Sequence, residues 1–428
     1  MKMFIKGTLC FFALCFQALP SLASPSWVKP IEGADANEKL DFWTGFSLFR
    51  SPWVAAPSST TGRDGLGPLF NARSCDACHK NGSAGKMPED GFGLILRLSS
   101  GNGQKTGPQA LVNYGGQLQT LSIDSITGGD QVPAEAKLQI TWEKFLAETG
   151  AELKRPQAKL DALAYGDEVS SAHASLRLAP PLFGLGLIDD IPVQGILHRE
   201  DENDENNDGI SGRANRVLNR ETGKLDVGRF GYKSEQPNLR QQVAAAFNED
   251  VGLSSWLYPN QICTLIQTAC LHMANGNSPE EGVEISREKL EKVTAFSALL
   301  RSPYADENLQ NSRGHKIFVS VGCASCHVPT LDNKNLIFSD LLLHDMGEGL
   351  ADGRAVYRAS SSEWRTTPLW GLSRKMLSQP ATLLHDGRAG SVEEAILWHD
   401  GEAKTARNAY LVLPDDEKKE LEKFLHTL

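Results

Sequence analysis

The sequence has no excess of positive charge and, beyond its opening segment, no long apolar run. Its 428 residues contain 43 Lys and Arg against 53 Asp and Glu, which gives a formal net charge of −10 at pH 7. Nucleic-acid-binding proteins usually carry a basic patch or stripe, and none stands out here. A bilayer-spanning helix needs about 20 consecutive apolar residues. These two absences exclude a multi-span membrane protein and argue against nucleic acid as a partner.

The overall composition is that of an ordinary globular protein. Hydrophobic residues make up 40% and charged residues 22% of the chain. These fractions exclude a wholly disordered chain and a fibrous protein. At about 150 residues per domain, the length predicts two to three domains.

The opening segment has the pattern of a secretory signal peptide. Lys2 and Lys6 precede an apolar run over residues 7–19, and the Ser-Leu-Ala sequence at 21–23 offers small residues for cleavage. We therefore expect a signal peptide over residues 1–23, export to the periplasm and no membrane span in the exported protein. The alternative is that this run serves as a membrane anchor.

Four of the eight cysteines lie in two C-x-x-C-H motifs, the pattern of c-type haem attachment. The motifs are Cys75-x-x-Cys78-His79 and Cys323-x-x-Cys326-His327. Two thiols can add to the vinyl groups of one porphyrin, and the adjacent histidine then lies under the iron as its proximal ligand. A redox dithiol would need no histidine at this position, and a zinc site would need distant thiolates to converge. The motifs predict two covalently bound haems c.

Two further cysteines, Cys263 and Cys270, are separated by a short polar and apolar stretch. In an exported protein such a pair usually forms a disulfide, and we expect one here as a structural staple. The alternative is two buried free thiols.

The periodicity along the chain favours a helical framework with a strand-rich insertion. Helices are expected over residues 38–49, 286–301, 311–321 and 415–428, and strands over 91–98 and 110–123. The resulting fold class is mainly α, with two cytochrome c-like haem domains. The first covers residues 24–300 with an insertion at about 85–200, and the second covers residues 301–428.

An acidic run before the middle of the chain resembles the start of a calcium-binding loop. Asp204, Asn206 and Asp208 place oxygen ligands at alternate positions, and Gly209 follows where such loops turn sharply. The twelfth position is Asn215, where an EF-hand has Glu. A calcium site and a solvated acidic loop are both open interpretations.

A weak internal repeat follows the two haem motifs. When Tyr232 is placed on His385, Leu239 falls on Val392, seven residues later in both halves. This register places the surroundings of the two predicted haems in correspondence.

These residues also resemble a known superfamily. The haem motifs, the Thr-Pro-Leu-Trp passage at 367–370, His-Asp-Gly-Arg-Ala at 385–389 and Val-Glu-Glu-Ala-Ile at 392–396 are similar to bacterial di-haem cytochrome c peroxidases and MauG. The closest resemblance is to the di-haem oxidoreductase branch. It implies that one haem transfers electrons and stays six-coordinate, whereas the other keeps an open position for peroxide.

The resemblance implies an asymmetric pair of irons. In the family the far ligand of the electron-transfer haem is a Met fourteen residues after the histidine that corresponds to His385. Here that position is His399, which we expect to be the far ligand of haem 2, with Met346 as the alternative. Two imidazoles usually give a lower potential than a His/Met pair. The same offset from Tyr232 falls on Ala246, which cannot bind iron, so haem 1 is expected to be open. The remaining alternative is closure by His173 or His198.

The resemblance also implies catalytic residues around haem 1. Gln242 matches a family glutamine, and Glu249 or Asp250 matches a carboxylate that moves a proton between the two peroxide oxygens. Tyr232 occupies a position where the family often has an inter-haem Trp, and we interpret it as an electron relay. The alternatives are a solvent-facing helix end for the carboxylates and simple packing for Tyr232.

The sequence thus predicts an exported di-haem oxidoreductase of the peroxidase type. A small redox protein or another donor would reduce haem 2, Tyr232 would relay electrons to haem 1, and peroxide or a similar oxidant would accept them. The alternatives are a non-catalytic di-haem electron-transfer cytochrome and a MauG-like enzyme that oxidises a partner protein. The sixth ligand of haem 1 distinguishes the carrier from the enzymes.

Overall fold

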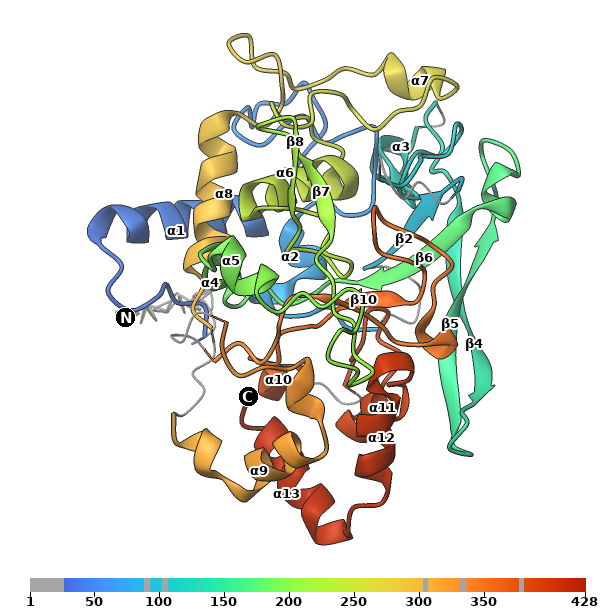
Figure 1. The fold of residues 1–428 in the computed structure, drawn as a ribbon. Coiled ribbons are helices and arrows are strands. Elements are labelled where there is room, and N and C mark those ends of the chain that lie inside the picture. Colours follow the sequence, from blue (N-terminus) through green and yellow to red (C-terminus); the bar gives the residue numbers. More distant parts are fainter. Residues whose placement is uncertain are drawn as a thin grey trace, which may run out of the picture.

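The computed structural model is shown as a ribbon in Figure 1. It describes residues 27–87, 93–101, 107–129, 131–302, 307–331, 336–376 and 381–428. The expected signal peptide over residues 1–23 lies outside the described residues. Among the described residues, no helix has the length and apolar character needed to cross a bilayer.

Helices are distributed along the described chain, and most of them are short. They are α1 (Ala36–Arg50), α2 (Cys75–Cys78), α3 (Ile123–Thr127), α4 (Leu185–Asp189), α5 (Val193–Leu197), α6 (Leu239–Val251), α7 (Thr268–Leu271), α8 (Arg287–Leu299), α9 (Arg313–Ser320), α10 (Leu372–Lys375), α11 (Val392–Leu397), α12 (Lys404–Leu411) and α13 (Asp415–Leu425).

The strands form small antiparallel pairs rather than one sheet. The pairs are β1 (Leu69–Phe70) with β3 (Leu121–Ser122), β2 (Leu94–Ser99) with β6 (His173–Leu178), β4 (Lys137–Leu146) with β5 (Glu152–Asp161), β7 (Arg216–Asn219) with β8 (Lys224–Val227), and β9 (Leu343–Asp345) with β10 (Glu363–Arg365).

The expected fold class of mainly α is wrong. Helices account for 32% and strands for 18% of the described residues, so the chain is a mixture of helices and small two-stranded sheets. Much of the strand content lies in the long β4–β5 hairpin, in the register Lys137 opposite Asp161. In β4, Leu138, Ile140 and Trp142 alternate with polar residues, which is a strand pattern that the expected strands over 91–98 and 110–123 did not include. The expected strand over 110–123 reduces to β3 and a tight turn at Leu111–Gly115.

The long amphipathic helices agree with expectation. A capping box between Asp35 and Glu38 begins α1, which reciprocally satisfies amide donors at a helix start. The helices expected over 286–301, 311–321 and 415–428 are α8, α9 and α13. Their apolar residues face inward because each helix has a continuous apolar stripe along one face.

Two hydrophobic cores organise the molecule. In the first, the α1 rings of Phe42, Phe46 and Phe49 pack around Phe296 of α8, with centroids 4.9–5.2 Å apart. In the second, rings from α9, α13 and the segment between them pack together. Segments cross between the cores, since Trp370 is buried in the first. The domain boundary near residue 300 therefore stays a prediction.

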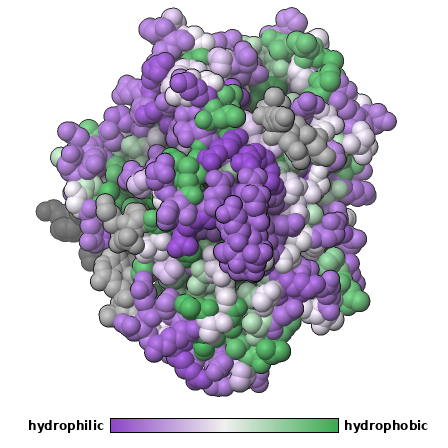
Figure 2. Space-filling view, viewed as in Figure 1, coloured by the Kyte–Doolittle hydropathy of each residue, from purple (hydrophilic) through white to green (hydrophobic). Residues whose placement is uncertain are grey.

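The strand-rich insertion reaches both halves of the molecule. Figure 1 shows the β4–β5 hairpin extending beside α11 and α12. At that end Phe145 stacks on Trp398, with ring centroids 5.0 Å apart. The face seen in Figure 2 is largely hydrophilic, with hydrophobic side chains in small separate areas. The insertion thus packs on the C-terminal half as well as on the first.

Candidate active site

Each C-x-x-C-H motif lines its own cavity. The first cavity is lined by both thiols of α2, by His79 directly after this helix, and by residues of α6. The second cavity is lined by Cys323, Cys326 and His327, together with residues from α11 and α12. The four cysteines are free thiols. Each cavity therefore presents the two thiols and one imidazole that a haem c requires.

The proximal histidines are oriented for metal binding. His79 Nδ1 lies 2.7 Å from the Pro180 carbonyl oxygen, and His327 Nδ1 lies 3.0 Å from the Phe338 carbonyl oxygen. A carbonyl oxygen only accepts, so each Nδ1 carries the proton and each Nε2 keeps its lone pair for iron. Burial lowers the pKa of both imidazoles to about 4. They are therefore neutral, as a ligand must be.

The second cavity contains a second suitable imidazole. His399 lines it, and its Nδ1 lies 2.7 Å from the Ala395 carbonyl oxygen, which again leaves Nε2 free. Burial lowers the pKa of His327, and the neighbouring His399 lowers it further. Met346, the alternative ligand, lines the same cavity. The structure therefore brings both candidate ligands to this cavity.

The first cavity contrasts with the second. Of the histidines in the described part of the chain, His79 alone lines the first cavity. Ala246, at the position that corresponds to His399, also lines it and offers no ligand atom. His173 and His198 are not among its lining residues. This arrangement is compatible with an iron that has one axial position open.

One of the two expected carboxylates faces the first cavity. Asp250 lines this cavity with Gln242, and burial raises the Asp250 pKa to about 6. The neighbouring Glu249 instead pairs with Arg97 and is not among the cavity-lining residues that are described. A carboxylate with a pKa near neutrality is suited to accept and return a proton. On this geometry Asp250 fits the expected role better than Glu249.

A comparison with protein families gives a match over residues 157–428, to the family described as "Di-haem oxidoreductase, putative peroxidase". The chain belongs to this family. A search of curated proteins finds no similar sequence. The matched segment includes Tyr232, α6, the second haem motif and His399, whereas the first haem motif and β2 precede it. The family indicates an oxidoreductase that uses haem.

In this di-haem oxidoreductase the backbone fixes the end of α6 at the first cavity. The Asp250 carbonyl accepts hydrogen bonds from the amides of Asn71 (2.8 Å) and Ala72 (3.0 Å). Gly252 ends the helix with φ +74°, and a Cβ there would lie 2.5 Å from the Leu69 carbonyl oxygen. Only glycine fits such a close approach at positive φ. The C-terminus of α6 is thereby fixed against the segment that leads to Cys75.

Sequence reasoning missed two side chains from the insertion that hold the Asp250 region. Gln117 Nε2 donates to Asp250 Oδ1 at 2.9 Å and to the Glu249 carbonyl at 2.8 Å. Arg97 of β2 forms the ion pair with Glu249. Polar residues within an apolar strand are a weak signal, and nothing in the sequence shows which distant partner they meet. The insertion is therefore part of the first cavity.

Residues between the two cavities are shared by both. Tyr232, Arg365 and Trp370 line both cavities. The Tyr232 hydroxyl donates to the Leu178 carbonyl oxygen at 2.9 Å, and burial raises the pKa of the phenol. In the sequence, Trp370 stands out only as the last residue of the Thr-Pro-Leu-Trp passage. The structure places it in the lining of both cavities, as it does Tyr232.

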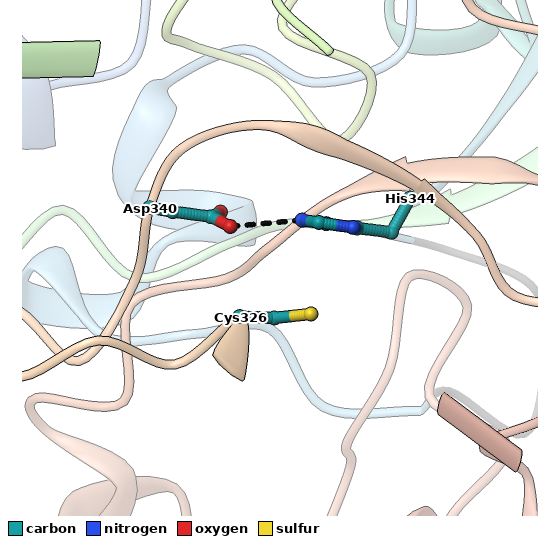
Figure 3. A group of neighbouring side chains, drawn as sticks. All are labelled: Cys326, Asp340 and His344. Atoms are coloured by element: carbon teal, nitrogen blue, oxygen red, sulfur yellow. Dashed lines mark hydrogen bonds and ion pairs between the residues drawn. The ribbon is translucent and has the colours of Figure 1, made fainter. Parts of the chain in front are cut away.

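A polar cluster borders the second cavity. His344 Nε2 lies 2.8 Å from Asp340 Oδ2, and its Nδ1 lies 2.7 Å from Glu402 Oε2. Burial opposes the protonated form, but Asp340 and Glu402 raise the His344 pKa well above its usual value. Figure 3 shows the Cys326 sulfur beside Asp340 and His344. In a haem c this sulfur is a thioether rather than a thiolate, so we interpret the cluster as a polar wall.

Side-chain oxygens of the acidic loop accept hydrogen bonds from backbone amides of the same loop. Asp204 Oδ1 and Asn206 Oδ1 both accept a hydrogen bond from the Asp208 amide, at 2.9 Å and 2.8 Å. Among the described residues, the side chains close enough together to bind one metal ion are Cys326, Asp340 and His344, and the acidic loop is not part of this group. Calcium binding by this loop stays a prediction. Elsewhere, the structure contains a disulfide between Cys263 and Cys270.

Proposed function

We propose that this chain is an exported di-haem c-type oxidoreductase with peroxidase activity. A small redox protein or another donor reduces haem 2, and peroxide or a similar oxidant is reduced at haem 1. One observation carries the proposal. The second cavity presents two imidazoles with free Nε2 atoms, His327 and His399, whereas the first presents His79 and, opposite in the repeat, Ala246.

The ligand sets assign different tasks to the two cavities. His327 and His399 would hold haem 2 with both axial positions occupied, and two imidazoles give a lower potential than a His/Met pair. A six-coordinate iron can change its oxidation state but has no position for substrate. His79 would hold haem 1 from one side. When bound, a haem with an open position supplies peroxide binding and one-electron redox chemistry.

The chain supplies proton transfer at the first cavity. Reduction of hydrogen peroxide to water consumes electrons and protons, and one proton must move from the inner to the outer oxygen. Asp250, with a pKa near 6, can accept that proton as carboxylate and return it as carboxylic acid. Gln242, which lines the same cavity, has an amide that can hydrogen-bond peroxide. Gln117 keeps the Asp250 carboxylate in place.

Tyr232 provides a side-chain link between the two cavities. Its ring borders both, and its hydroxyl is fixed on the Leu178 carbonyl oxygen. A phenol with a raised pKa stays protonated at neutral pH. We propose that electrons pass through this region, which Trp370 also lines.

Low-temperature EPR of the purified di-haem protein, fully oxidised and then half reduced, tests the proposal. We expect a high-spin ferric signal from haem 1 beside a low-spin bis-His signal from haem 2. Low-spin signals alone, with haem 1 still capped after half reduction, would identify an electron carrier and refute the catalytic role of Asp250. Export is tested separately, because the exported protein is expected to begin after residue 23.

A further inference from the structure

Several buried basic side chains lie at the first cavity or close to the residues that line it. Arg177 of β6 is 5% exposed, Lys233 is fully buried and Arg354 is 3% exposed. Arg177 itself lines the first cavity, as does Arg365, which also lines the second. We call Arg177, Lys233, Arg354 and Arg365 the basic wall.

The acidic side chains next to the basic wall already interact with its cations. The Asp352 carboxylate accepts from Arg177 Nη2 (3.0 Å), Lys233 Nζ (3.0 Å) and the Ser175 hydroxyl (2.7 Å). Burial would raise the pKa of Glu235, yet Arg97, Arg177 and other cations around it lower it overall. Both acids are therefore anionic, and each is shared among several cations.

The positive charges nevertheless exceed the negative ones. The basic wall contributes four cations, whereas Glu235, Asp352 and, beside Arg365, Asp340 contribute three anions. Burial is the main reason that the Lys233 pKa falls to about 8 and the Arg354 and Arg365 pKa values fall to about 10. An unpaired buried charge destabilises the folded protein. A further anion bound next to the basic wall would remove this cost.

Unused donors show where that anion would bind. The Nε and Nη1 atoms of Arg177 and the Nη1 atom of Arg354 are buried and have no hydrogen-bond partner among the described residues. A buried donor without a partner costs about 1–3 kcal/mol, and more when charged. The Arg177 guanidinium lies over Trp364, 4.4 Å from the ring centroid, which fixes its position. Because Arg177 lines the first cavity, its two unused donors belong to a residue that borders a ligand there.

We propose that the basic wall is a carboxylate-binding site of the first cavity, and that its occupant is a propionate of the haem attached through Cys75 and Cys78. The inference rests on the proposed haem 1 but not on peroxidase activity. A free carboxylate has the same chemistry. The propionate is favoured because a covalently attached haem keeps its carboxylates permanently in this cavity, at a high effective concentration. Arg177 then anchors the cofactor and adds a fixed positive charge near its iron.

The test compares Arg177→Gln with Arg177→Lys in the di-haem protein. Arg313→Gln is the matched control, since Arg313 lies on α9 with a side chain 54% exposed. Resonance Raman spectroscopy reads the propionate bending band of haem 1, and spectroelectrochemistry reads the potentials of both haems, with and without formate. No peroxide is present, so loss of peroxidase activity does not affect the result.

We expect Arg177→Gln to shift the haem 1 propionate band and lower its potential. Loss of a positive charge favours ferric iron, and a tenfold change in the ratio of reduced to oxidised haem 1 corresponds to 59 mV for one electron. Arg177→Lys keeps the charge and should restore most of the potential. Haem 2 should move less, because Arg177 does not line its cavity among the described residues.

Two results would overturn the proposal. If formate changes the wild-type potential but not that of Arg177→Gln, the ligand is a free anion and the propionate assignment is wrong. If the propionate band is unchanged in Arg177→Gln and formate has no effect, the wall binds no carboxylate. Should Arg177→Gln fail to assemble with haem, Arg365→Gln repeats the comparison for haem 1, because Arg365 also lines the first cavity.

Discussion

Replacing Gln117 with leucine is expected to raise the pH below which peroxide turnover is lost. Gln117 donates a hydrogen bond of 2.9 Å to Asp250 Oδ1, and this bond stabilises the ionised carboxylate. Arg97 lowers the Asp250 pKa as well, whereas burial and the neighbouring Glu249 raise it. Without Gln117 the unfavourable effect of burial is opposed by Arg97 alone, so the Asp250 pKa must rise from its value of about 6.

The size of the change follows from the strength of a charge-assisted hydrogen bond. Such a bond contributes about 1.5–3 kcal/mol, and one pKa unit corresponds to about 1.4 kcal/mol. The acidic limb of kcat/KM against pH is therefore expected to move upward by about 1–2 pH units. Activity should be lost as the pH falls, because the base must be ionised to accept the first proton.

Steady-state peroxide reduction with a reduced electron donor, measured across the pH range, provides the assay. Gln119→Leu is the matched control, because Gln119 Nε2 donates to the Glu249 carbonyl at 3.0 Å and Gln119 has no hydrogen bond to the Asp250 carboxylate. Its profile should keep the wild-type acidic limb. An unchanged limb in Gln117→Leu, in a protein that retains both haems, would refute Asp250 as the base.

Three further predictions address single residues. Asp250→Asn should reduce turnover by about 10²–10⁴-fold. It should also raise the melting temperature at neutral pH, since the raised pKa shows that burying the ionised group is unfavourable there; a lower melting temperature would contradict this. His399→Met should raise the haem 2 potential in spectroelectrochemistry, whereas Met346→Leu should leave it unchanged, and the reverse pattern would make Met346 the ligand. Tyr232→Phe removes the bond to the Leu178 carbonyl and should slow reduction of haem 1 by haem 2 in stopped-flow measurements; an equal rate would exclude the phenol as a relay.

Local patterns in the sequence were sufficient to identify the two C-x-x-C-H motifs and to predict the long helices. A C-x-x-C-H motif works through residues within five positions of one another, so its chemistry does not depend on the rest of the fold. The helices α1, α8, α9 and α13 begin at capping residues or acidic first turns and carry an apolar stripe, which are also local features. The resemblance to the family rested on such short passages as well.

The tertiary structure alone decided how the cavities are built. The mainly α class failed because two-stranded sheets such as β4–β5 form only where a second segment pairs with the backbone of the first. Gln117 and Arg97 meet their partners across 133 and 152 residues of chain. The excess of cations in the basic wall arises from side chains on separate segments. Charge balance and hydrogen-bond satisfaction are properties of a packed environment, and a sequence does not show them until folding brings those segments together.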